Sequence, residues 1–487
     1  MIQSRIQSFP SEIGFLFILL FGIIFLLIVD PRQDSERLAM WYSYSATSRR
    51  PSTSWLLSSN TNYSLSQHRP LIFHSSSLPL THEEIKGSEY YKQPPSAADM
   101  QLDKVEGILA GARASIREAT ANTDRSSKLD DPDYIPHGDI YRNPNAFHWS
   151  YLLMEKHFKV FVYEEGEPPI FHYGLCKDIY STEGFFLNFM ELDTRFRTRD
   201  PGEAHVYFLP FSVVMILEHL FDPVIRDKAV LQRVLVDYVH IISSKYPYWN
   251  RSFGTDHFML SCHDWGPRAT WYVPQLYFNA IRVLCNANTS EHFNPNKDAS
   301  FPEINIRTGD IQNLTESSHL KEERPILAFF AGGLHGQIRP ALFHHWKEKD
   351  DTLLVYETLP RGMSYSEMMT KSKFCLCPSG HEVASPRIPE AIYADCIPVL
   401  ISENYVLPFS DVLNWDSFSV KVSVQDIPDL KRILAGIPEK EYARMQNNVR
   451  QVKRHFAVND PPRRYDVFNM IIHSIWLRRL NLRVGLR

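Results

Sequence analysis

Residues 374–409 constrain the fold of this 487-residue chain more than any other stretch. Two short apolar runs, residues 374–377 and 397–401, have the length and composition of buried parallel strands. A polar loop and a short helix beginning near Pro389 are expected between them, so the stretch predicts one βαβ unit. The loop has small and basic residues that suit an anion beside a helix N-terminus. These residues are Ser379, Gly380, Ser385 and Arg387.

Alternating strand and helix patterns extend on both sides of this unit. The expected strands are residues 159–163, 205–211, 256–262, 326–331, 353–356, 374–377, 397–401 and 418–422, with helices at 182–192, 224–245, 439–455 and 464–480. Further helices are expected between the four strands from 326 to 401, and a polar connection at 286–324 separates two groups. This order predicts an α/β fold with two Rossmann-like domains, 151–320 and 321–487, facing a cleft. Ligands of such folds bind where the strands end.

An apolar run at residues 13–29 holds 17 residues without a charge, near the lower limit for a membrane-spanning helix. The sequence that follows, Asp30-Pro31-Arg32-Gln33, offers no small-x-small cleavage site, which favours a retained signal anchor over a cleaved signal peptide. Residues 1–12 then form a short tail. The basic residues flanking the run do not by themselves favour a cytosolic N-terminus.

Glycosylation acceptors and cysteines indicate the compartment. All four Asn-x-Ser/Thr sites lie after the apolar run, as expected if the C-terminal body is lumenal. They are Asn62, Asn250, Asn288 and Asn313. An oxidising compartment permits disulfides, and Cys262 with Cys285 is the preferred pair. Cys375 and Cys377 share one strand face and are expected to be buried thiols, and no Cys/His spacing predicts a zinc site.

Residues 30–150 have a different character and are interpreted as a lumenal stem. The first part is rich in Ser, Thr, Asn, Gln and Pro and needs no fold. Residues 97–121 then show apolar side chains at helical spacing, which predicts a stem helix that docks on the body or self-associates. A linker is expected around residues 130–133 and Pro144. The net charge of −4 gives no reason to expect nucleic acid as a partner.

Several nucleotide-binding and hydrolase motifs are absent. The chain lacks a Gly-x-Gly-x-x-Gly turn after a strand, a Gly-Lys-Ser/Thr phosphate loop and a Gly-x-Ser-x-Gly elbow. The glycine cluster at residues 331–336 suits close approach to a diphosphate, with Arg339 adding charge, or is a plain βα turn. The one Asp-x-Asp pattern, Asp131-Pro132-Asp133, lies in the stem, so we expect no metal at the site.

Several long motifs occur in an order that resembles a plant exostosin-family glycosyltransferase, family 47. They are residues 159–163, 200–204, 249–251, 263–266 and 329–332 together with residues 374–409, and the resemblance spans roughly 160–468. It implies a GT-B fold in a single-pass type II protein of the Golgi membrane. The implied activity is inverting transfer of a hexose or pentose from a nucleotide sugar, usually UDP-linked, to a cell-wall polysaccharide or glycan. The implied orientation agrees with the acceptor sites.

Within this resemblance, Glu390 matches the position where such folds hold the ribose hydroxyls, although an acid in a first helical turn also has a structural explanation. Arg387 and Arg339 are expected to stabilise the leaving diphosphate in place of a metal ion, or to form surface ion pairs. Glu382 is expected to contact either the transferred sugar or a neighbouring backbone amide. The smaller loop residues donate to phosphate or cap the helix. These are Ser379, Gly380 and Ser385.

Inversion by direct displacement needs a base, which we expect on the first domain at the end of strand 256–262. Asp264 is the preferred base and His263 its rival, while a turn-forming role for Asp264 remains open. The nucleotide sugar is the only co-substrate expected. Two other functions stay open: an inactive family member that partners another transferase, in a homo- or hetero-oligomer, and a lumenal carbohydrate-binding protein.

Overall fold

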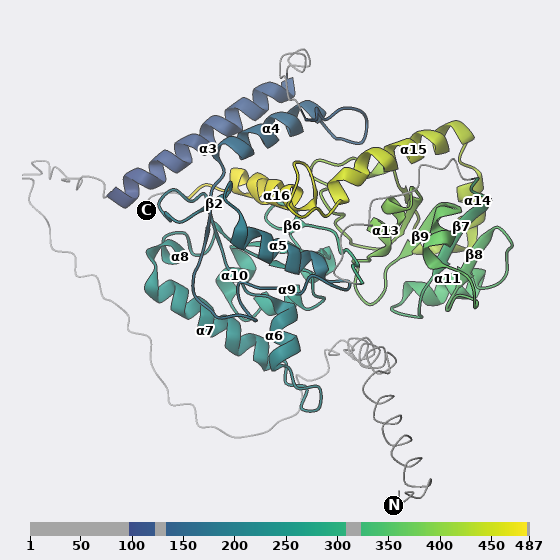
Figure 1. Cartoon of the computed structure of the whole chain (residues 1–487), viewed down its shortest axis with the longest axis horizontal. Coiled ribbons are helices and arrows are strands. Elements are labelled where there is room, and N and C mark those ends of the chain that lie inside the picture. The colour runs from purple at the N-terminus through teal and green to yellow at the C-terminus, as the bar shows by residue number, and fades with distance from the viewer. Residues whose placement is uncertain (1–96, 122–132, 308–322, 485–487) are drawn as a thin grey trace, which may run out of the picture. The chain divides into compact units, whose positions relative to one another are not determined.

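A computed structural model of the chain describes residues 97–121, 133–307 and 323–484 (Figure 1). Every described residue belongs to one compact unit, Pro94–Arg487. The expected anchor at 13–29, Asn62 and Asn313 lie outside the described residues and stay predictions. Within the described ranges, no helix is both long and apolar enough to cross a membrane.

The first half of this unit is built on a six-stranded parallel sheet in the order β2-β1-β3-β4-β5-β6. Its strands are β1 Val160–Val162, β2 Arg197–Thr198, β3 Val206–Phe208, β4 His257–Ser261, β5 Ile281–Leu284 and β6 Ala299–Ser300. The three strands predicted here are confirmed, whereas β2, β5 and β6 were missed. Arg282 interrupts the apolar run of β5, and the structure buries it because its guanidinium pairs with Asp298 at 2.5 Å.

Helices connect these strands. They are α5 Ser181–Leu192, α6 Val213–Leu220, α7 Ala229–Lys245, α8 Pro247–Ser252, α9 Gly266–Thr270 and α10 Pro274–Phe278. The predicted helix at 224–245 begins later, at Ala229. The helix α6 was missed because it is a short, mostly apolar run of eight residues, which a sequence pattern does not distinguish from a buried strand. The Ser212 side chain caps α6 by accepting a hydrogen bond from the Met215 N–H at 3.1 Å.

The second half holds a five-stranded parallel sheet in the order β11-β10-β9-β7-β8. Its elements are β7 Ile326–Ala331, α11 Ile338–Trp346, β8 Leu353–Tyr356, α12 Tyr365–Thr370, β9 Ser372–Pro378, α13 Arg387–Tyr393, β10 Ile397–Ile401, β11 Val420–Lys421, α14 Leu430–Ala435 and α15 Glu439–Val452. All five predicted strands are confirmed, and β9-α13-β10 is the predicted βαβ unit. The helix α13 begins at Arg387, slightly before the predicted start.

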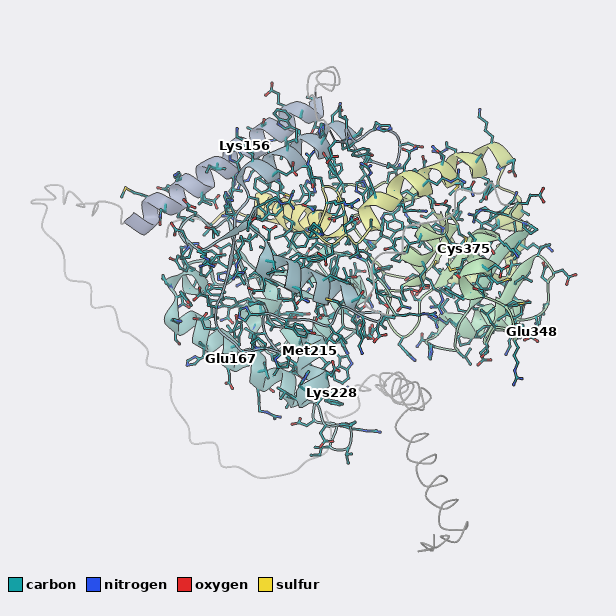
Figure 2. The ribbon with its side chains drawn as sticks, in the orientation of Figure 1. Lys156, Glu167, Met215, Lys228, Glu348 and Cys375 are labelled. Carbon is teal, nitrogen blue, oxygen red and sulfur yellow. A yellow bond between two sulfur atoms is a disulfide. The ribbon has the colours of Figure 1, made fainter. Side chains whose placement is uncertain are left out.

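The predicted stem helix is confirmed as α3 Ala97–Ala121, and it docks on the body beside α4 Pro144–His157 and α16 Val467–Asn481 (Figure 1). The Arg113 Nε donates to the Leu480 carbonyl at 2.6 Å, and Glu106 pairs with the buried Arg479 at 2.5 Å. The linker expected at Pro144 is wrong, because this proline opens α4 behind an Asn143 cap. Side chains fill the space between these elements densely (Figure 2).

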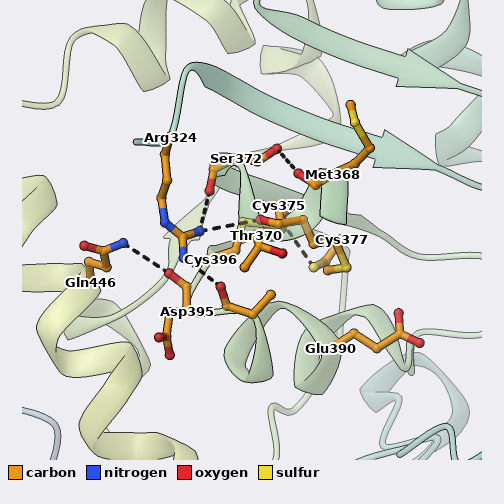
Figure 3. Close-up of a disulfide and its surroundings, with 12 residues drawn as sticks. Arg324, Met368, Thr370, Ser372, Cys375, Cys377, Glu390, Asp395, Cys396 and Gln446 are labelled. Atoms are coloured by element: carbon orange, nitrogen blue, oxygen red, sulfur yellow. Dashed lines mark hydrogen bonds between the residues drawn. A yellow bond between two sulfur atoms is a disulfide. The ribbon is translucent and has the colours of Figure 1, made fainter. Parts of the chain in front are cut away.

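Two disulfides tie neighbouring strands. The predicted pair Cys262–Cys285 is confirmed. The expectation of a free Cys375 is wrong, because Cys375 pairs with Cys396 (Figure 3). In the parallel register Cys375 on β9 lies beside Pro398 on β10, which brings it next to the cysteine just before β10. Cys377 is confirmed as a buried thiol.

Candidate active site where the two sheets' strand ends meet

Three polar residues follow neighbouring parallel strands of the first sheet. Asp264 comes after β4, Asn286 after β5 and Glu303 after β6. Because parallel strands end at the same edge of a sheet, the three lie at one edge. Asn286 and Glu303 are buried, while Asp264 is half-buried. The first half therefore presents carboxyl and amide groups at its strand ends.

Two loops of the second half pack closely because of glycine. A Cβ atom on Gly336 would lie 1.8 Å from the Gly380 carbonyl oxygen, and Gly336 also has φ +70°. A Cβ atom on Gly380 would lie 3.0 Å from an Arg339 Nη atom. The glycine cluster after β7 and the predicted anion loop after β9 thus form one surface, and the cluster is more than a plain turn.

Both predicted arginines lie against the ring of Phe330 in this surface. The Arg387 Cζ is 5.0 Å and the Arg339 Cζ 5.6 Å from the ring centre. Arg387 donates to the Ala331 carbonyl at 3.1 Å, and Arg339 donates to the Gly333 carbonyl at 2.9 Å. Arg339 is buried, so the surface ion pair considered for it is wrong. Hydrogen bonds to backbone carbonyls and contact with one aromatic ring therefore hold two positive charges close together at this strand end.

Hydrogen bonds join the two halves at these strand ends. The Asn286 Nδ2 donates to Glu382 Oε2 at 2.8 Å, and the Asn305 Nδ2 contacts Glu390 Oε1 at 3.4 Å. In the backbone, the Val406 N–H donates to the Ala287 carbonyl at 2.9 Å. The predicted residues of both halves therefore face one site.

Burial raises the pKa values of Asp264 and Glu382 by different amounts. Burial, followed by the charge of Glu291, raises the pKa of Asp264 to about 6, against a hydrogen bond with Tyr180 that lowers it. Burial and the charges of Asp264 and Glu291 raise the pKa of Glu382 to about 9. At neutral pH Asp264 is mostly ionised and Glu382 is protonated. Asp264 can thus accept a proton, and Glu382 can donate a hydrogen bond.

The rival base, His263, is less well placed. Its Nδ1 accepts a hydrogen bond from the Trp265 N–H at 2.9 Å, which leaves the proton of the neutral ring on Nε2. Burial lowers the pKa of His263 to about 3, so a second proton is strongly disfavoured. This geometry favours Asp264.

Glu390 and the loop serines have partners within the protein. The Tyr365 hydroxyl donates to Glu390 Oε2 at 3.0 Å, and burial raises the pKa of Glu390. The Ser379 hydroxyl donates to Ser402 Oγ at 2.6 Å. The Ser385 Oγ accepts from the Arg387 N–H at 3.4 Å, while Pro386 occupies the N-cap position of α13. The serines thus hold the loop, and their contacts with a ligand stay predictions.

Glu303 was missed by the sequence reasoning. Burial, followed by the charges of Asp264 and Glu390, raises its pKa well above the ordinary value, and both arginines oppose this shift. Glu303 therefore lies among the predicted residues of both halves. No sequence signal marked it, because β6 is only two residues long and the polar residues Asn296, Lys297 and Asp298 precede that strand.

Across residues 97–121, 133–307 and 323–484, no group of three or more His, Cys, Asp or Glu side chains is placed to hold a metal ion.

The described acceptor asparagines lie on the first half: Asn250 is exposed, whereas Asn288 is half-buried beside Tyr405. Their glycosylation stays a prediction.

Comparison with known proteins adds an independent line of support. Residues 154–437 match the model of the Exostosin GT47 domain. A probable glycosyltransferase of Arabidopsis thaliana is 70% identical over 401 residues, covering 82% of this chain and 83% of that protein. A second one from the same plant is 57% identical over 383 residues, covering 79% and 73%. A probable glucuronosyltransferase of Oryza sativa subsp. japonica is 29% identical over 344 residues, covering 65% and 79%.

Proposed function

The chain belongs to the exostosin family of glycosyltransferases, family 47. We propose that it transfers a sugar with inversion of the configuration at the anomeric carbon and without a metal ion. The donor is a UDP-sugar, and the acceptor is a cell-wall polysaccharide or glycan. One observation carries this proposal: Asp264 of the first half and Arg339 and Arg387 of the second half all lie close enough to the buried Glu303 to shift its pKa. A rice relative named as a probable glucuronosyltransferase supports a sugar nucleotide as donor.

The proposed architecture is GT-B, with Rossmann-like domains at 151–320 and 321–487. Two parallel sheets with strand ends that meet support it. The protein is proposed to be a type II protein of the Golgi membrane, anchored by residues 13–29. The acceptor sites after that run and the two disulfides support a lumenal body.

The second domain is proposed to bind the donor. Glu390 accepts hydrogen bonds from the ribose hydroxyls, exchanging its present contacts with Tyr365 and Asn305. Arg387 and Arg339 hold the diphosphate, because fixed guanidinium groups provide charge-assisted donors. The backbone of Gly380 allows close approach of the phosphates.

Transfer then proceeds by direct displacement. The acceptor oxygen bonds to the anomeric carbon while its proton moves to Asp264. The bond from that carbon to the diphosphate oxygen breaks, and its electron pair leaves with the diphosphate, which Arg387 and Arg339 stabilise. The protonated Glu382 donates a hydrogen bond to the transferred sugar. Attack from the face opposite the leaving group inverts the configuration.

A panel of UDP-sugars tests this proposal on the full-length chain purified in detergent. We expect donor hydrolysis or transfer with one donor and a kcat/KM that rises with pH through about 6, because Asp264 must be ionised. Asp264→Asn should lower kcat by about 10²- to 10⁴-fold at unchanged donor affinity. Glu390→Ala should weaken donor binding. Glu403→Gln, an exposed change in the next loop, is the matched control.

Three results would overturn parts of the proposal. Full turnover in Asp264→Asn would exclude it as the base. Loss of turnover in a chelator, restored by added divalent cation, would exclude metal-independent chemistry. Tight glycan binding without turnover of any donor would instead identify a carbohydrate-binding protein or an inactive partner of another transferase.

A further inference from the structure

A hollow of about 380 Å³ lies where the segment before α4 meets the end of α15. This volume falls within the range of about 300–1,000 Å³ found for small-molecule sites. Its polar lining residues are Tyr134, His137, Arg450, Gln451, Lys453 and Arg454. None of them belongs to the site at the strand ends, so the hollow needs an explanation of its own.

Arg454 is held in a fixed position in this hollow. Its guanidinium Cζ lies 3.6 Å from the centre of the Tyr134 ring, which is the distance of face-on stacking. The Tyr134 hydroxyl is hydrogen-bonded to the Tyr141 hydroxyl at 2.8 Å, and Tyr141 to His455 Nε2 at 2.6 Å. Because stacking uses the face of a guanidinium, its N–H edge stays directed sideways and suits a planar oxyanion.

The charges around the hollow are unequal. Arg450 and Lys453 share one carboxylate, Asp395, at 3.5 Å and 2.5 Å. Together with Arg454, the hollow has three cationic lining residues, two of which pair with the same carboxylate. Basic residues in a last helical turn also interact favourably with the helix dipole. The dipole does not explain why a tyrosine from a distant segment fixes one of these cations.

We propose that this hollow binds a carboxylate-bearing sugar unit of an acidic glycan. Arg454 offers two parallel N–H groups to the carboxylate, and Arg450 adds charge. His137 and Gln451 supply polar groups for ring hydroxyls. The glycan part of this proposal rests on the proposed function. A second point of attachment keeps the glycan near the site of transfer, because it raises the effective concentration of the chain end.

Isothermal titration of the full-length protein in detergent tests this inference with three probes. They are α-1,4-linked trigalacturonate, the neutral galactose trisaccharide of the same linkage, and inorganic phosphate. We expect trigalacturonate to bind at least tenfold more tightly than the neutral sugar, and phosphate not to compete with it. Arg454→Gln and Arg450→Gln should each weaken binding by about tenfold or more. Arg432→Gln, an exposed arginine on α14 that pairs with Asp429, is the matched control.

Several outcomes would overturn the inference. If the neutral sugar binds equally well, the carboxylate is not what the hollow recognises. If phosphate competes fully, the hollow is a site for inorganic anions. If trigalacturonate does not bind, or binds equally well to both arginine variants, the hollow is not its binding site. Thermal melting checks that the variants fold, and Arg450→Gln, at an exposed position, serves as the deciding variant if Arg454→Gln unfolds. Glu390→Ala should bind trigalacturonate normally, so this inference and the transferase proposal fail independently.

Discussion

Replacing Glu382 by glutamine tests the electrostatics of the joined strand ends. Burial and the charges of Asp264 and Glu291 raise the pKa of Glu382 from 4.5 to about 9. Glutamine retains an oxygen that can accept the hydrogen bond from Asn286 Nδ2, now 2.8 Å long, and nearly retains the shape of the side chain. The substitution therefore removes only the ability to ionise.

The sign of the effect follows from proton binding. The folded state holds the Glu382 proton well above pH 4.5, whereas the unfolded state releases it there. The free energy of unfolding of the natural protein thus falls, relative to the variant, as the pH rises from about 4.5 to about 9. Each pH unit in this window contributes at most about 1.4 kcal/mol. Between pH 5.5 and 7.5 we expect roughly 1 to 2 kcal/mol, since solvent screens a half-buried carboxyl.

The assay is chemical unfolding of the natural protein and of Glu382→Gln at both pH values and equal ionic strength. The stability difference should widen in favour of the variant at pH 7.5. Glu403→Gln is the control, because this exposed glutamate lies in the loop after β10. A difference that stays constant with pH, or a variant less stable at pH 7.5, would show that Glu382 is ionised in the folded protein and refute the reasoning.

Two further predictions concern the loop and the strands beneath it. Gly336→Ala should lower the free energy of unfolding by a few kcal/mol more than Gly362→Ala, because a methyl group at Gly336 meets the Gly380 carbonyl at 1.8 Å. Gly362 also has positive φ, +89°, but nothing within 4 Å, so equal losses in urea unfolding would contradict the steric argument. Replacing Cys375 and Cys396 by alanine should cost about 3 kcal/mol, given a sequence separation of 21. An unchanged melting temperature would show that this disulfide contributes little.

The sequence by itself determined the strands of the second half and the stem helix. Parallel strands buried on both faces are continuous apolar runs, and the runs of β7, β9 and β10 show this directly. The helix Ala97–Ala121 was equally readable, because its apolar residues recur with helical period. The sequence also predicted the anion loop, because glycine, serine and arginine residues follow β9.

Tertiary structure alone decided which distant residues meet. Asn286 and Glu382 are 96 positions apart, and Asn305 and Glu390 are 85 apart, so no local pattern connects them. Glu303 follows a strand of two residues, too short for any periodicity. The reason is physical: burial, pKa shifts and the second disulfide depend on strand order and on how the two halves meet, whereas sequence periodicity reports only which face of each element is buried.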